Sequence, residues 1–120
     1  MAVTQISRIK TRDVNVASDG FTFTPATAAA DGFEVDFQGK DNRTVIVATN
    51  TVATAGTLTI KGSATSTRGG QDIVLSVPAS KSIAFTLDSA YFMETSGTKK
   101  GKVTIIPSAT TISIAAIEPR

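Results

Sequence analysis

Residues 71–88, QDIVLSVPASKSIAFTLD, contain two runs of alternating apolar side chains separated by a short break. Alternate side chains of a β-strand point to opposite faces, so each run predicts a strand with one face in a core. Pro78 and the small polar residues after it favour a turn. The pattern predicts a β-hairpin, and further strands must cover its apolar face because two strands alone are not stable in water.

Similar runs fill the rest of the 120-residue chain, which suits one domain. Short apolar stretches rich in Val, Ile and Thr alternate with turn signals. We therefore expect an all-β fold, a single antiparallel β-sandwich of jelly-roll or Ig-like type. Residues 25–120 form the sandwich, and residues 1–24 form an extended N-terminal arm or an edge strand. Residues 24–32 fit either one or two helical turns or a loop.

The composition excludes several classes of function. The chain has no cysteine and no histidine, which removes thiolate chemistry, Ser-His-Asp catalysis and most zinc sites. A net charge of +2 is too small to imply nucleic acid as a partner. No apolar run has the length of a membrane span, and the N-terminus lacks a secretory signal. We expect a soluble protein made in the cytoplasm, without enzymatic activity, cofactor, metal or membrane association.

Basic residues occur in three places that are candidates for contact with a partner. Arg8, Lys10 and Arg12 alternate, and would project from one side of an extended segment. Arg68 lies in a loop without apolar residues, and Lys99 and Lys100 lie in a polar turn. The alternative for each is an ordinary solvated surface.

Two carboxylates, Glu34 and Asp36, lie on one face of an expected strand. Their separation of about 7 Å resembles a paired-carboxylate site for a glycosidase or for calcium. An acidic strand face opposite Lys or Arg on the neighbouring strand explains the same pattern without a function.

Four segments resemble the head decoration, or cement, proteins of tailed bacteriophages. They are AADGFEVDFQGKDNRTVIVATNT, TLTIKG, QDIVLSVPASKSIAFTLDSAYF and GKVTI, within residues 29–105. The features that carry the resemblance are Asp31-Gly32 before an aromatic strand, Asn50 after the apolar strand, and Val77-Pro78-Ala79 followed by Lys81.

The resemblance implies a structural virion protein that binds the outer surface of the capsid and reinforces contacts between coat subunits. Its partner would be the major capsid protein, and members of such families are trimers or monomers. The contact residues would be Arg8, Lys10, Arg12 and Arg68, with Lys99 and Lys100 as a second set. The alternative is a carbohydrate- or receptor-binding β-sandwich, which would expose Tyr91 or Phe92 beside polar loops.

Overall fold

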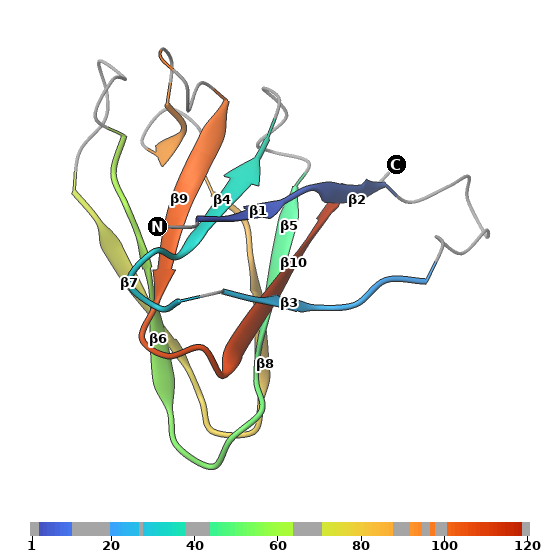
Figure 1. Cartoon of the computed structure of the whole chain (residues 1–120), viewed down its shortest axis with the longest axis vertical. Helices are drawn as coiled ribbons and strands as arrows, with labels where there is room; N and C mark the ends of the chain where they lie inside the picture. Colours follow the sequence, from blue (N-terminus) through green and yellow to red (C-terminus); the bar gives the residue numbers. More distant parts are fainter. Residues whose placement is uncertain are drawn as a thin grey trace.

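The computed structural model describes residues 3–10, 20–26, 28–37, 44–63, 71–87, 92–94, 97 and 101–118. These residues form ten β-strands in two sheets that pack face to face (Figure 1). The prediction of an all-β sandwich is confirmed. The sheets are mixed, however, because the two N-terminal strands run parallel to their neighbours.

The first sheet has five strands, with β1 and β7 at its edges. In spatial order they are β1 (Thr4–Ile6), β4 (Phe33–Asp36), β9 (Lys102–Pro107), β6 (Gly56–Ile60) and β7 (Ile73–Val77).

The second sheet is built around the long strand β10, and β8 lies at its far edge. In spatial order its strands are β2 (Arg8–Lys10), β10 (Ile112–Glu118), β5 (Val45–Asn50) and β8 (Ser82–Phe85). The short strand β3 (Thr24–Pro25) pairs antiparallel with the beginning of β10.

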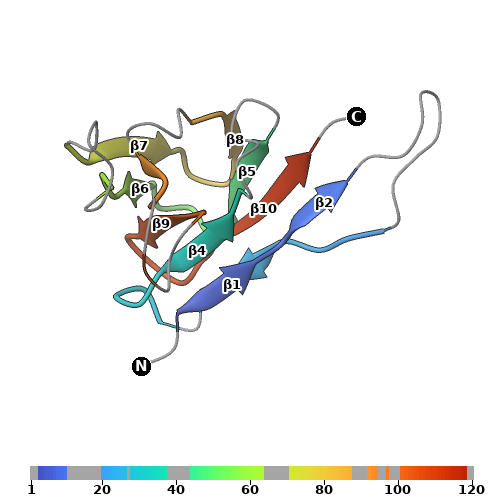
Figure 2. The ribbon, with the colours of Figure 1, turned by 90° about the horizontal axis from the view of Figure 1, so that it is seen from above.

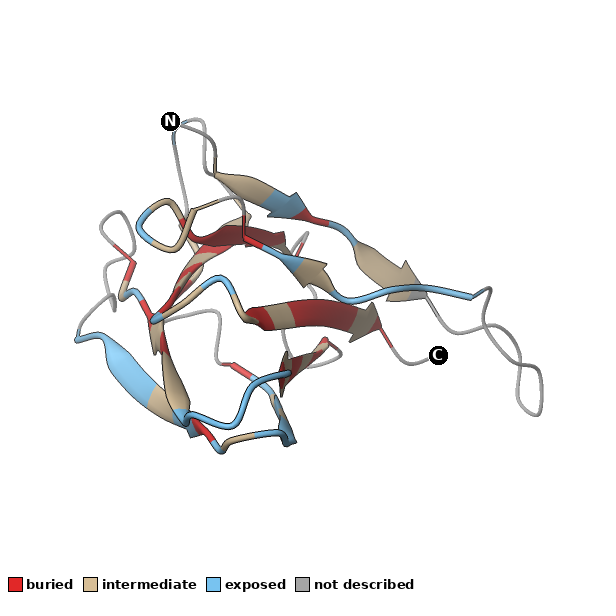
Figure 3. Ribbon diagram, turned by 60° about the horizontal axis from the view of Figure 1, so that its bottom comes forward, coloured by how far each residue is buried: buried red, intermediate tan, exposed pale blue. Residues whose placement is uncertain are grey.

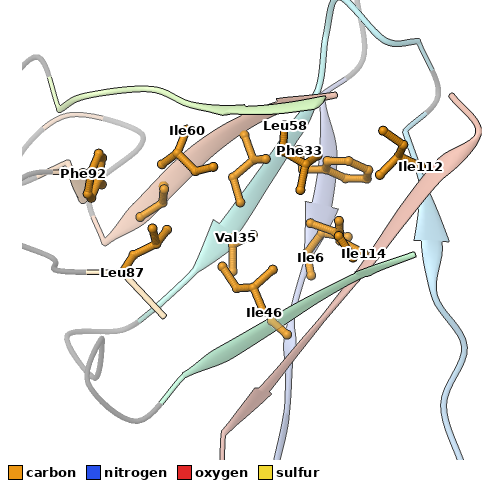
Figure 4. Close-up of a cluster of buried hydrophobic side chains, with 14 of the residues drawn as sticks. Ile6, Phe33, Val35, Ile46, Leu58, Ile60, Leu87, Phe92, Ile112 and Ile114 are labelled. Carbon is orange, nitrogen blue, oxygen red and sulfur yellow. The ribbon is translucent and has the colours of Figure 1, made fainter. Parts of the chain in front are cut away.

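The core lies between the two sheets and is made by the inward-facing residues of both (Figure 4). Phe33 and Val35 of β4 are fully buried, as are Ile46 of β5 and Ile114 of β10. Burial of one such side chain contributes about 1.5–3 kcal/mol, so the two apolar faces hold the sheets together.

The predicted hairpin at residues 71–88 is wrong. Strand β7 pairs with β6 in the first sheet, whereas β8 pairs with β5 in the second sheet. The connection at residues 78–81 therefore carries the chain from one sheet to the other. The alternation of apolar residues is the same in both arrangements, because Val77 and Phe85 point into the core from opposite sheets.

Two further connections cross between the sheets at the same end of the sandwich (Figure 1). Residues 51–55 join β5 to β6, and residues 108–111 join β9 to β10. Backbone hydrogen bonds link all three crossings, from Ser80 N to Val52 O at 2.8 Å and from Thr51 N to Thr111 O at 3.4 Å. We call these three connections the crossing loops.

The buried side chain of Asn50 ties the crossing loops to the strands. Its Nδ2 donates to Thr54 O at 2.8 Å and to Val77 O at 3.4 Å, and its Oδ1 accepts from Val52 N at 3.3 Å. Asn50 is 2% exposed, so water cannot replace these bonds.

The described N-terminal residues 4–10 take the edge-strand form, one of the two forms expected from the sequence. Residues 4–6 and 8–10 are edge strands of the two sheets, and the chain changes sheet at Ser7. Residues 28–32 form a turn closed by hydrogen bonds from Asp31 N and Gly32 N to Ala28 O, instead of a helix. Gly32 has φ of 67°, which favours glycine, and a Cβ there would meet Ile105 O at 2.5 Å.

We expect Asn50→Ala to lower the free energy of unfolding by about 1–3 kcal/mol, because it removes the three hydrogen bonds of a buried amide, one of them to the buried Val77 O. Chemical denaturation measures the loss. The control is Thr51→Ala, which removes only an exposed 3.3 Å bond to Thr111 O and should cost less than about 0.5 kcal/mol. Equal losses for the two variants would contradict the role given to Asn50.

Candidate functional site

The candidate contact surface begins with the N-terminal strands, which close one side of the sandwich (Figure 2). Strand β1 runs parallel to β4, with Thr4 opposite Phe33 and Ile6 opposite Val35. Ile6 is 6% exposed and belongs to the core. The segment is therefore fixed to the body by hydrogen bonds to both sheets and by a buried side chain.

Arg8 forms an ion pair inside the protein. Its Nη1 lies 3.1 Å from Glu118 Oε2, and the two side chains are 9% and 6% exposed. Arg8 is opposite Ala116 in the parallel register, so its side chain starts from the core-facing side of the sheet. A partner would have to break this pair to reach the guanidinium, so we assign Arg8 to holding β2 on β10.

Of the other basic candidates, the structure describes only Lys10. Lys10 ends β2 opposite Glu118. Arg12, Arg68, Lys99 and Lys100 lie outside the described residues. The role of these residues in contact therefore remains a prediction.

An exposed aromatic pair lies just before β3. Phe21 and Phe23 are 43% and 39% exposed, and their rings meet edge to face with centroids 6.2 Å apart and planes at 68°. Phe21 and Phe23 alternate with Thr22 and Thr24, a pattern that is also typical of a half-buried strand. In the structure they precede the short strand β3, which pairs with the beginning of β10, and their rings stay exposed.

The carboxylate pair does not form an open site. Glu34, expected on a solvated face, is 6% exposed, and its Oε1 accepts from Gln5 Nε2 at 2.6 Å. Lys102 Nζ in turn donates to Gln5 Oε1 at 2.8 Å, and Lys102 lies opposite Asp36 in the ladder. Within the described ranges there is no group of three or more acidic side chains suited to a metal ion.

Asp72 and Lys61 close the base of the loop that contains Arg68. Lys61 Nζ lies 2.7 Å from Asp72 Oδ2, and Gly62 N donates to Asp72 Oδ1 at 2.8 Å. These two hydrogen bonds hold the pKa of Asp72 below its usual value of 3.8, and the bond from Lys61 has the larger effect. The ends of the loop are thus joined beside β6 and β7.

The opposite side of the sandwich carries the outer strands β7 and β8. Ile73 and Val74 of β7 are 39% and 62% exposed, the latter being the most exposed large apolar residue of the described chain. Figure 3 shows most of β7 as exposed at the left rim of the molecule.

Comparison of the chain with protein-family models, with curated proteins and with solved structures found no match. In the part of the chain that the structure describes, no helix has the length and apolar character needed to cross a bilayer.

Arg8→Ala should destabilise the fold by about 3 kcal/mol, because it leaves Glu118 buried without its charge partner. Thermal and chemical denaturation measure the loss. Arg8→Met combined with Glu118→Leu should recover much of it, since apolar side chains avoid the desolvation of two charges. If the double variant is as unstable as Arg8→Ala, the loss is not due to the unpaired charge.

The Asp72 carboxyl should titrate below pH 3.8, and Lys61→Met should move its midpoint upward. A depressed pKa in the folded state contributes stability above the unfolded pKa, and this contribution is lost as pH falls through the folded pKa. Carbon-detected NMR titration measures the midpoint. Lys81→Met, which removes an exposed lysine at a crossing loop, is the matched control and should leave the midpoint unchanged.

Proposed function

We propose that the chain is a structural virion protein that binds the outer surface of a bacteriophage capsid and stabilises contacts between coat subunits. It acts without enzymatic activity or cofactor, and its partner is the major capsid protein. The proposal is supported by the resemblance of residues 29–105 to head decoration proteins and by a sandwich whose N-terminal side is tied to both sheets. Docking onto a lattice is favoured by such a fixed body, since conformational freedom lost on binding reduces affinity.

The observation that carries the proposal is the exposed pair Phe21–Phe23, which directly precedes β3 in the chain. Aromatic side chains are the most common energetic anchors of protein interfaces, because they bury a large area with few rotatable bonds. Strand β3 holds the adjoining backbone against β10, through Thr24 opposite Ile114. The rings are thus presented from a fixed base.

The basic residues contribute attraction to the coat surface. Lys10 and Arg12 follow the ion-paired Arg8 in sequence, and Arg68, Lys99 and Lys100 are the remaining candidates. Exposed charges act mainly on the rate of association and are screened by salt. We therefore assign most of the affinity to the aromatic pair and the salt dependence to the lysines and arginines.

The test is binding to capsids assembled without this protein. Phe21→Ala with Phe23→Ala should weaken binding by at least about tenfold, and Lys10→Glu with Arg12→Glu should weaken it mainly at low salt. Co-sedimentation with the capsids measures occupancy. The control is Val52→Ala, which shortens an exposed apolar residue of a crossing loop, away from this surface. Unchanged occupancy for both double variants would contradict the proposal.

The alternative function is a carbohydrate- or receptor-binding module, and the same aromatic pair favours it. Sugars stack on an open ring face, and Phe21 and Phe23 are both partly open. The 68° between the rings prevents one flat platform across both. Binding on a glycan array that is lost in the Phe21→Ala, Phe23→Ala variant, without capsid binding by the native chain, would favour this alternative.

A further inference from the structure

We infer that β7 is an association edge through which two copies of this chain pair antiparallel, about a two-fold axis at Val74. This inference concerns the side of the sandwich opposite the N-terminal strands and does not rest on the proposed function. Strand β7 is the last strand of the first sheet, and β6 is its one neighbour in the described chain.

The direction of the backbone groups follows from the hydrogen bonds of β6. Lys61 N donates to Thr104 O, and Thr57 O accepts from Ser108 N, so the odd-numbered residues of β6 face β9. The even-numbered residues therefore face β7, because N–H and C=O alternate in direction along a strand. Leu58 is opposite Leu75, which makes Ile73, Leu75 and Val77 the hydrogen-bonded partners of β6. Val74 and Ser76 consequently direct their N–H and C=O away from the sheet.

The side chains of β7 lack the usual protection of a sheet edge. Edge strands normally carry a charge, a proline or a bulge that prevents pairing. Strand β7, IVLSV, has no charge and no proline within its bounds, and it pairs with β6 in unbroken register. The one charge on the pairing edge, Asp72 just before β7, is engaged by Lys61 of its own chain at 2.7 Å. Strand β2 by contrast contains Arg8 and Lys10, and the outward residues of β8, Ser82 and Ala84, offer little apolar surface.

A second copy is the occupant that this edge fits best. With the axis at Val74, each Val74 lies beside Val74 of the partner subunit, and Asp72 lies beside Ser76 of the partner subunit. The Asp72–Ser76 pair occurs twice by symmetry, so there are three outward-facing pairs. They can form six backbone hydrogen bonds, since each hydrogen-bonded pair of an antiparallel ladder exchanges two. The most exposed apolar side chain is covered by its own copy. The like charges at Asp72 stay about 13 Å apart along the strands, so they do not oppose the pairing.

The expected strength of the pair follows from its size. A five-residue edge covers much less than the roughly 1,200–2,000 Å² of a stable interface, so the pair is weak in dilute solution. Its contribution grows where copies are held at high effective concentration, because each contact then forms within one assembly.

Cysteine cross-linking tests the register, because the chain has no cysteine of its own. In the native-length chain, Val74→Cys should form a disulfide-linked dimer, since hydrogen-bonded partners have Cα atoms about 5.5 Å apart, within the range of a disulfide. Ala84→Cys, an exposed position on the edge of the other sheet, is the matched control and should give at least fivefold less dimer under the same mild oxidant. Equal yields for the two variants would overturn the inference.

Sedimentation equilibrium of the native chain tests the pairing without a cross-link. We expect reversible monomer–dimer exchange at high micromolar to millimolar concentration, at least tenfold weakened by Val74→Lys and little changed by Ala84→Lys. Circular dichroism should show both lysine variants folded, as lysine is tolerated where the native side chain is exposed. A monomer at all concentrations, or a trimer in place of a dimer, would overturn the inference.

Discussion

The fold depends on the burial of two apolar sheet faces against each other. Three connections join a strand of one sheet to the next strand of the other: β5 to β6, β7 to β8 and β9 to β10. These crossing loops all lie at the same end of the sandwich. The buried amide of Asn50 joins the loop at residues 51–55 to Val77 at the end of β7, because it bonds three backbone groups at once. Apolar burial supplies the driving force, and this polar cluster determines how the sheets are aligned.

The sequence predicted the faces of the strands better than their partners. Val77 and Leu87 are buried as the alternation in residues 71–88 indicated, although they meet the core from different elements than a hairpin would give. The hairpin at residues 71–88 failed because alternation specifies only which side chains meet the core. A hairpin and a crossing between sheets bury the same side chains, so the choice depends on hydrogen-bond partners far away in the chain.

The candidate contact surface was harder to predict for the same reason. Arg8 reads as one of three similar basic residues, but its partner Glu118 is 110 positions away. The exposed rings of Phe21 and Phe23 resemble an inward strand face in sequence, and Glu34 resembles an outward one. Burial of a polar group and exposure of an aromatic one both depend on tertiary neighbours, and no local pattern encodes them.

The two proposed association surfaces lie on opposite sides of the sandwich. Strands β1, β2 and β3 close one side, and β7 and β8 form the other (Figure 2). If a copy binds a lattice through Phe21 and Phe23 as proposed, β7 stays accessible to a neighbouring copy. The Arg8–Glu118 pair fastens β2 to β10, and β5 connects β10 to β8 across the second sheet. The first sheet likewise runs without a break from β1 through β4, β9 and β6 to β7, so backbone hydrogen bonds join the N-terminal side to the proposed pairing edge.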